Sequence, residues 1–244
     1  MYDYQKSKET VEKILKSSTK IEERSTIPSS DSEFTYENGI KAWVGALFID
    51  IVDSSKLFKS PNENTARIIR SFCSEIISIL KDDPNYREIG IRGDCVYGIF
   101  STQFREDLVK VFEHAYRINS FMKMLNKLLK KNNYSTITAG IGLGCSEDLI
   151  IKAGQNGSGI NDKIWIGKAV VEAAHLSDIA NRNGVSPIAL SPLFYNNVIE
   201  LLCEANPNYK YWIKEHRKEY YGSVDYYACN IVETRFDEWI EKNI

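Results

Sequence analysis

The sequence predicts an α+β fold of ferredoxin-like type, in which helices cover one face of an antiparallel sheet. From residue 39 onward, apolar runs of strand length alternate with long segments of helical period in the order β, α, β-β, α, β. The chain has 244 residues, of which 43% are hydrophobic and 26% are charged, as in an ordinary globular protein. A domain of this size buries enough surface to fold without disulfides or structural zinc.

The first 38 residues are predicted to form a helix and a linker. Val11, Ile14 and Leu15 lie at helical spacing within residues 5–17. Residues 18–38 are polar and rich in Ser, Thr and Glu, which is typical of a surface loop or linker. We therefore divide the chain into residues 1–38, the N-terminal helix and linker, and residues 39–244, the main domain.

The elements of the main domain follow from periodicity and turn residues. Residues 41–52 form an apolar run of strand length, and residues 62–81 repeat apolar side chains at helical spacing. Two short apolar runs, 88–91 and 95–100, flank Arg92-Gly93-Asp94 and predict a β-hairpin. The other predicted elements are a helix at 106–129, strands at 136–145 and 149–153, a loop at 154–162, a helix at 167–181, a strand at 187–190, a helix at 192–203 and an aromatic hairpin from residue 209.

Composition excludes several classes of partner. The 31 basic residues nearly balance 33 acidic ones, so a nucleic acid is not an expected partner. The longest apolar run, residues 43–52, is far too short to cross a bilayer, and the polar N-terminus does not resemble a secretory signal. The five cysteines form no CxxC pair, which favours free thiols. These features predict a cytoplasmic protein with no membrane or nucleic-acid partner.

Two aspartates stand where a carboxylate is costly. Asp50 interrupts the apolar run from Ala46 to Val52, and Asp94 lies at the turn of the predicted hairpin. If the two strands are neighbours, both carboxylates converge at one end of the sheet, where oxygen ligands suit Mg²⁺ or Mn²⁺. Taken singly, Asp94 is equally compatible with simple turn chemistry, and Asp50 with capping the helix that follows it.

Three segments resemble the motifs of the class III nucleotidyl cyclases. Residues 48–58 (FIDIVDSSKLF) resemble the first metal motif, and residues 92–100 (RGDCVYGIF) resemble the second. The third match joins residues 138–142 (TAGIG) to residues 165–181, which begin WIGKAV. The resemblance implies that residues 39–244 are a catalytic domain that converts a nucleoside triphosphate to a 3′,5′-cyclic nucleotide and pyrophosphate.

The resemblance also implies roles for individual residues. Asp50 and Asp94 would be catalytic and, with the carbonyl of Ile51, would hold two divalent cations per site, Mn²⁺ or Mg²⁺. The backbone amides of residues 52–55 would cradle the phosphates. The residues expected to bind the nucleotide are Phe48, Ser54, Ser55, Arg92 and Lys168. The active sites would lie at the interface of a homodimer.

The sequence departs from the purine cyclases of this family at four positions. Gly90 stands in place of a base-reading lysine, and Ile164 in place of a polar base-reading residue. Val171 and His175 replace an asparagine and an arginine that act in the transition state. Because a pocket discriminates only through matching hydrogen bonds, these losses argue against ATP or GTP.

The chain looks more like the bacterial antiphage (Pycsar) pyrimidine cyclases. That resemblance implies that UTP is converted to cyclic UMP, which acts on a separate effector protein in antiphage defence. The alternatives are a cyclase of the same mechanism that uses CTP or ATP, and an inactive cyclase-like module that binds nucleotide. Arg92 is also compatible with a structural ion pair, and Lys168 with plain solvation.

Overall fold

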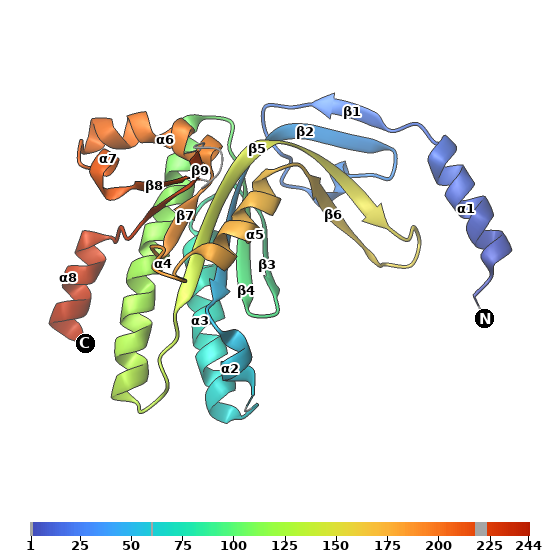
Figure 1. Ribbon diagram of the computed structural model, residues 1–244. Coiled ribbons are helices and arrows are strands. Elements are labelled where there is room, and N and C mark those ends of the chain that lie inside the picture. The colour runs from blue at the N-terminus through green and yellow to red at the C-terminus, as the bar shows by residue number, and fades with distance from the viewer. Residues whose placement is uncertain (1, 60, 218–223) are drawn as a thin grey trace.

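The computed structural model describes residues 2–59, 61–217 and 224–244, and within them a nine-stranded sheet forms the centre of the molecule (Figure 1). The strands are β1 Lys20–Glu23, β2 Asn38–Ile51, β3 Tyr86–Arg92, β4 Cys95–Ser101, β5 Ala139–Gly154, β6 Asn161–Ile166, β7 Ile188–Leu190, β8 Lys214–Arg217 and β9 Val224–Cys229. The helices are α1 Tyr4–Lys16, α2 Ser54–Phe58, α3 Glu63–Lys81, α4 Arg105–Lys131, α5 Ala169–Ile179, α6 Pro192–Ala205, α7 Tyr209–Trp212 and α8 Thr234–Asn243.

The predicted ferredoxin-like arrangement is confirmed at the core of the sheet. The strands follow the order β3-β4-β2-β5-β7-β9-β8, and the first four are joined by antiparallel pairs. The sheet is nevertheless mixed, because β7 pairs with β5 in parallel and β1 pairs with β2 in parallel. The fold is therefore α+β, with an antiparallel ferredoxin-like unit that is extended at its edges.

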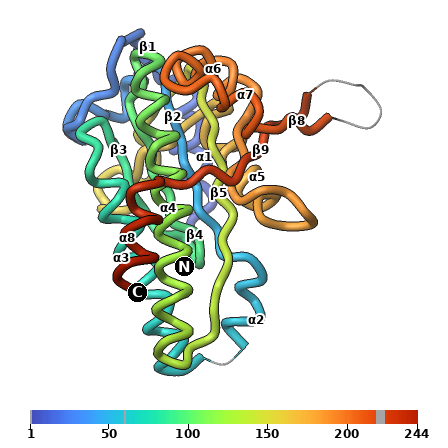
Figure 2. The backbone as a smooth tube through the Cα atoms, turned by 90° about the vertical axis from the view of Figure 1, so that its left-hand side faces the viewer, coloured from blue at the N-terminus to red at the C-terminus, as the bar shows by residue number. Residues whose placement is uncertain are grey.

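Helices cover both faces of the sheet, which corrects the expectation of a single covered face. Leu47 and Ile49 of β2 point into the core formed with α3 and α4. Val44 and Ala46 point to the opposite face, where they pack with Ala173 of α5. Figure 1 shows α5 lying across β5, and Figure 2 shows α4 in front of the sheet with α8 beside it.

Three alternate glycines of β5 allow α5 to lie directly on the sheet. A Cβ at Gly140, Gly142 or Gly144 would fall well inside van der Waals contact of the carbonyl oxygens of Ser177, Ala173 and Ala169, respectively. Because residues two apart on a strand share a face, the three glycines form a smooth track for one side of the helix. The position of α5 over β2 and β5 is thereby fixed by backbone contact.

The segment at residues 18–38 is largely exposed, as predicted for a surface loop, but it is attached to the sheet. Its residues Lys20–Glu23 form β1 and pair with the start of β2. Ile27 and Phe34 are buried in the core cluster on the α5 side of the sheet, and the Ile27 amide donates to Ser101 Oγ at 2.9 Å. Two apolar side chains and a strand pairing are enough to anchor this otherwise polar stretch. The helix predicted at residues 5–17 is present as α1, and none of its residues is buried.

The other predictions for secondary structure hold with four differences. The strands predicted at 136–145 and 149–153 are one continuous strand, β5, and part of the predicted loop at 154–162 belongs to β6, which pairs with it. The predicted aromatic hairpin is present as β8 and β9, although residues 209–212 form a short helix first and residues 218–223 lie outside the described part of the chain. The terminal helix α8 was not predicted.

Two predictions based on composition also have a structural outcome. All five cysteines are free thiols. Within residues 2–59, 61–217 and 224–244, no helix is long and apolar enough to cross a membrane.

Candidate active site

The structure brings Asp50 and Asp94 together at one end of two neighbouring strands. Ile49 of β2 pairs with Val96 of β4, so Asp50 lies level with the beginning of β4. Asp94 occupies the two-residue turn between Arg92 and Cys95, which pair with each other. Gly93 precedes it with a φ of 63°, a conformation that a two-residue hairpin readily assigns to glycine. The turn thus delivers the second carboxylate to the end of the strand that carries the first.

Asp50 is held in a partly buried, electrostatically mixed environment. Its side chain is 17% exposed and projects to the α5 face of the sheet, opposite the α3–α4 core. Burial raises the pKa of this carboxyl, and the negative charge of Asp94 raises it further. Arg182 acts in the opposite direction, because its Nη2 donates to Asp50 Oδ2 at 2.6 Å. Asp50 is thus subject to the opposing charges of Asp94 and Arg182.

Arg182 was not identified from the sequence. It follows α5 in a turn where Asn181 and Asn183 both have positive φ, 59° and 51°. The Asn181 side chain donates to the carbonyl of Ala139 at 3.0 Å, which ties this turn to the start of β5. The sequence does show an Asn-Arg-Asn-Gly turn directly after the helix of the third motif. It does not show that Arg182 of this turn contacts Asp50, which lies 132 positions earlier.

The oxygens of Asp50 and Ile51 converge on one point that suits a cation. Arg182 Nη2, a positively charged group, lies 2.6 Å from Asp50 Oδ2 and 3.4 Å from the Ile51 carbonyl oxygen. In the described part of the chain, no group of three or more His, Cys, Asp or Glu residues forms a metal site. Two carboxylates and a carbonyl nonetheless fit Mg²⁺ or Mn²⁺, which take few protein ligands and complete their shell with phosphate and water.

The segment predicted to bind phosphate begins where β2 ends. Ser54 and Ser55 open the short helix α2, and Asp53 precedes them with a φ of 56°. The Asp53 carboxylate pairs with Lys56 Nζ at 2.6 Å and does not cap the helix. The Val52 amide donates to the Thr138 carbonyl at 2.8 Å, so Val52 does not contribute to the expected cradle of amides. Ser54 and Ser55 remain beside the carboxylates as candidates.

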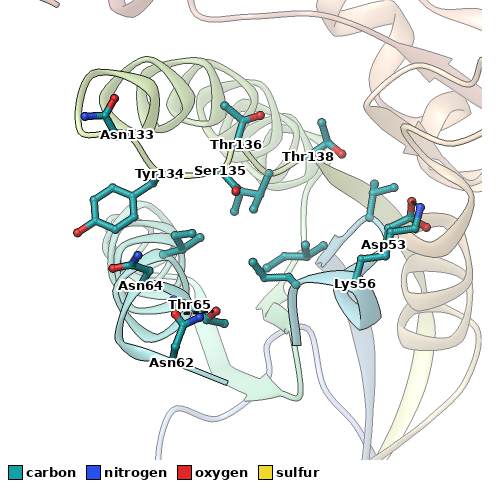
Figure 3. Close-up of a pocket in the computed structure, with 15 residues that line it drawn as sticks. Asp53, Lys56, Asn62, Asn64, Thr65, Asn133, Tyr134, Ser135, Thr136 and Thr138 are labelled. Carbon is teal, nitrogen blue, oxygen red and sulfur yellow. Dashed lines mark hydrogen bonds and ion pairs between the residues drawn. The ribbon is translucent and has the colours of Figure 1, made fainter. Parts of the chain in front are cut away.

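A cavity of about 510 Å³ adjoins this segment but lies on the other side of β2 (Figure 3). It is lined by Asp53 and Lys56 on one side and by Asn62, Asn64 and Tyr134 on another. Ile51, which points to the α3–α4 core, also lines it, whereas Asp50 does not. The cavity is therefore separate from the two carboxylates.

Aromatic and polar side chains gather beside Asp50 on the same face of the sheet. The rings of Phe48 and Tyr97 are stacked, with centroids 5.1 Å apart. The Tyr97 hydroxyl donates to Glu88 Oε1 at 2.7 Å, and Trp165 Nε1 donates to Glu88 Oε2 at 3.0 Å. Burial and the neighbouring Glu88 raise the pKa of Tyr97 to about 12. Arg92 lies two residues beyond Gly90, the pairing partner of Tyr97, so it shares the face of the sheet that carries Tyr97, whose hydroxyl raises the pKa of Arg92.

The structure explains why Gly90 stands where purine cyclases carry a lysine. A Cβ at Gly90 would lie 2.5 Å from both Cζ and Oη of Tyr97. The Tyr97 ring therefore occupies the space through which a side chain at position 90 would have to pass. Tyr97, Glu88 and Trp165 are candidate base-pocket residues that the sequence did not single out.

Lys168 is not brought near the carboxylates within one chain. It lies exposed at the N-terminus of α5, whereas Asp50 pairs with Gly140 beneath the C-terminal end of that helix. The amides of Lys168 and Ala169 donate to Ser146 Oγ at 3.1 and 2.7 Å. If Lys168 binds the nucleotide held by Asp50 and Asp94, a second copy of the chain must supply it.

A buried carboxylate also supports the N-terminus of α5. Asp148 is 0% exposed, and the Ser146 hydroxyl donates to its Oδ1. Burial raises the pKa of Asp148. Gly167 packs directly against it, because a Cβ at Gly167 would overlap Asp148 Oδ1. Each end of α5 thus faces one aspartate of the sheet.

Comparisons with known proteins bear on the family and on the fold. No family model matches the chain. A uridylate cyclase of Treponema porcinum is 41% identical over 245 residues, which cover 100% of this chain and 82% of that protein. A uridylate cyclase of Gulbenkiania mobilis is 29% identical over 253 residues, covering 99% and 97%. The crystal structure of the adenylyl cyclase CyaB from P. aeruginosa has the same fold, with a TM-score of 0.61 and 19% identity over 82% of this chain and 98% of that one.

Proposed function

Because this chain belongs to the uridylate cyclases, a family of nucleotidyl cyclases with the class III fold, we propose that it converts UTP to 3′,5′-cyclic UMP and pyrophosphate. The observation that carries this proposal is the meeting of Asp50, Asp94 and the Ile51 carbonyl at the end of β2. Two divalent cations per site, Mn²⁺ or Mg²⁺, fit these oxygens.

The proposed roles of the site residues follow from their charges. Asp50 and Asp94 supply anionic oxygens, and Ile51 adds a neutral one. Cations bound there would neutralise the triphosphate and acidify the ribose 3′-hydroxyl that attacks the α-phosphorus. Ser54 and Ser55, which begin α2 directly after β2, would bind phosphate oxygens through their amides and hydroxyls. Holding the 3′-hydroxyl close to the phosphorus contributes much of the remaining acceleration.

The base pocket supports a pyrimidine rather than a purine. Tyr97 fills the space that a side chain at position 90 would need, and Ile164 offers no hydrogen bond to a base. Phe48 and Arg92 border the same space, one as a stacking surface and the other as a donor. A pocket without purine-reading groups loses discrimination for ATP and GTP, whereas the smaller uracil ring needs fewer contacts.

The exposed side of α5 supports a homodimer with active sites at its interface. Lys168, Val171 and His175 all lie exposed on or beside this helix. In one chain Lys168 is far from the carboxylates, so a second copy would complete the site. We further propose, from the resemblance to antiphage cyclases, that the product acts on a separate effector protein in the cytoplasm, without nucleic-acid or membrane partners.

Product analysis tests the proposed activity. The purified protein is incubated with Mn²⁺ and each of the four ribonucleoside triphosphates, and the products are identified by mass. We expect cyclic UMP from UTP, lost in Asp50→Asn and Asp94→Asn and retained in Asp82→Asn, which alters an exposed carboxylate of a surface ion pair. Cyclic CMP or cyclic AMP as the main product would reassign the substrate. No cyclic product from a folded protein would favour an inactive nucleotide-binding module.

A further inference from the structure

We propose that Arg182 is a further substrate-binding residue of this site, which competes with a divalent cation for Asp50 and Ile51 and turns to a triphosphate oxygen when metal and nucleotide bind. The proposal rests on the proposed function, because it assumes that Asp50 and Ile51 receive a metal ion.

The contacts of Arg182 coincide with those expected of the metal. Its Nη2 lies 2.6 Å from Asp50 Oδ2 and 3.4 Å from the Ile51 carbonyl oxygen, the two oxygens assigned to a cation. A divalent ion bound to the same two oxygens would lie close to the guanidinium, and the two positive charges would repel each other. Binding of a metal ion to Asp50 and Ile51 therefore favours movement of the guanidinium away from these oxygens.

The charges around Asp50 favour a positive group beside it. Asp94 and Asp178 are negative neighbours of Asp50, and Arg182 is a positive one, with Nη2 2.6 Å from Asp50 Oδ2. Two like charges around a partly buried carboxylate are unfavourable unless a positive group offsets them. Arg182 thus supplies the kind of charge that a metal ion would bring to the same oxygens.

Arg182 has a second anchor, so it does not leave the site when it is displaced. Its Nη1 donates to the Ser177 and Ala180 carbonyls at 2.8 and 3.2 Å. These carbonyls lie at the C-terminal end of α5, where a positive charge is favourable. Nη1 can therefore hold the guanidinium beside the carboxylates while Nη2 changes partner.

The chemistry and exposure of the displaced group favour phosphate. A guanidinium presents several donors in one plane and binds phosphate oxygens more specifically than an ammonium does. The Arg182 side chain is 23% exposed, so a ligand at this end of the sheet can reach it from solvent. The turn that carries it is tied to Ala139, next to Gly140, the pairing partner of Asp50, so the movement needed is small.

Two binding measurements test the proposal without relying on turnover. The first is the affinity for Mn²⁺ in the absence of nucleotide, from the resonance of free Mn²⁺. The second is the affinity for a non-cyclisable UTP analogue at saturating Mn²⁺. The variants are Arg182→Gln, which removes the charge, and Arg182→Lys, which keeps the charge but loses the planar donors. Arg105→Gln is the matched control, because Arg105 pairs with Glu200 on the surface.

We expect Arg182→Gln to bind Mn²⁺ about threefold to tenfold more tightly, because a competing positive charge is gone. The same variant should bind the analogue about tenfold more weakly, because a charge-assisted hydrogen bond to phosphate is lost. Arg182→Lys should stay within about twofold of the wild type for Mn²⁺ and still bind the analogue more weakly. Arg105→Gln should match the wild type in both measurements.

The proposal is overturned if Arg182→Gln is folded, as judged by its thermal unfolding midpoint, and leaves either affinity unchanged. Unchanged Mn²⁺ affinity would mean that Arg182 does not compete with metal, and unchanged analogue affinity would mean that it does not bind phosphate. Failure of the proposed function has a different signature. The wild type would then bind no Mn²⁺, or Asp94→Asn would bind it as tightly as the wild type.

Discussion

Asp148 and Asp50 face opposite ends of the same helix, α5, and they differ in burial and in interaction partners. Asp148 is fully buried, accepts from the Ser146 hydroxyl, and has one oxygen without a hydrogen-bond partner among the described residues. Asp50 is partly exposed, pairs with the positively charged Arg182, and faces a second carboxylate, Asp94. Burial raises the pKa of both. The difference separates a carboxyl that supports a helix from one that is open to a ligand.

The largest expected effect is on catalysis, at Asp50 and Asp94. Asp50→Asn and Asp94→Asn should each lower kcat/KM for UTP by about a thousandfold or more, because metal-bound charge stabilisation contributes several kcal/mol. Their free energies of unfolding should not fall, since each substitution removes a negative charge from a crowded site. Steady-state kinetics and urea unfolding measure the two quantities. Asp148→Asn is the control. A comparable loss of activity in this variant would contradict the assignment of a structural role to Asp148 and a catalytic role to Asp50.

The next effect is on stability, at Gly167. A Cβ at this position would overlap Asp148 Oδ1, so Gly167→Ala should lower the free energy of unfolding by about 2–4 kcal/mol. Gly157→Ala is the matched control, because Gly157 has a φ of 80° and no atom within 4 Å of its added Cβ. That control should lose only about 1–2 kcal/mol from backbone strain. Equal losses in urea unfolding would show that Asp148 does not pack tightly against Gly167.

A smaller effect is expected in the pH dependence of stability. Since burial raises the pKa of Asp148 above its unfolded value, the folded protein binds the proton more tightly. The free energy of unfolding should therefore fall as pH rises from about 4 through the raised pKa, and level off above it. Asp148→Asn should flatten this dependence, as measured by unfolding at a series of pH values.

Without added metal, Asp50 should contribute to the pH dependence of stability with the same sign as Asp148, because its pKa is also raised by burial and by Asp94. Saturating Mn²⁺ should reverse the Asp50 contribution, because metal binding favours the charged carboxylate and lowers its pKa in the folded protein. The Asp148 contribution is therefore measured in Asp50→Asn, where it should be the same with and without Mn²⁺. Its loss from that variant on addition of Mn²⁺ would contradict the assignment of Asp148 to a purely structural role.

The smallest effect is expected at Ser146. Its Oγ accepts from the amides of Lys168 and Ala169, so Ser146→Ala removes a cap from α5 and should lower the free energy of unfolding by about 1 kcal/mol. The value of kcat should stay within about twofold of the wild type, because the cap lies at the far end of the helix from Asp50. A large loss of kcat without a loss of stability would show that the N-terminal end of α5 takes part in catalysis.

The same comparison shows what the sequence could predict. Asp50 and Asp94 were identified because each interrupts or adjoins an apolar run, where a carboxylate is conspicuous. Asp148 was missed because Ser146-Glu147-Asp148 separates two apolar runs and was interpreted as a break between strands. In the structure this stretch continues β5, and its polar side chains serve the N-terminus of α5.

The remaining omissions depend on contacts between distant segments. Arg182 lies in a polar turn, and its pairing with Asp50 follows from the close approach of α5 to the glycines of β5. The place of Tyr97 in the candidate base pocket depends on the missing side chain at Gly90, across the β3–β4 pair. Periodicity predicts where such elements begin and end, but the face on which two of them meet is decided by packing.

The most direct test of the account is a crystal structure with Mn²⁺ and a non-cyclisable UTP analogue, in which the metal is located by its anomalous scattering. We expect two Mn²⁺ peaks next to the analogue's phosphates, both coordinated by carboxylate oxygens of Asp50 and Asp94, with the Ile51 carbonyl bound to one of them. The account is contradicted if the analogue is bound and Mn²⁺ is coordinated elsewhere, with neither carboxylate among its ligands.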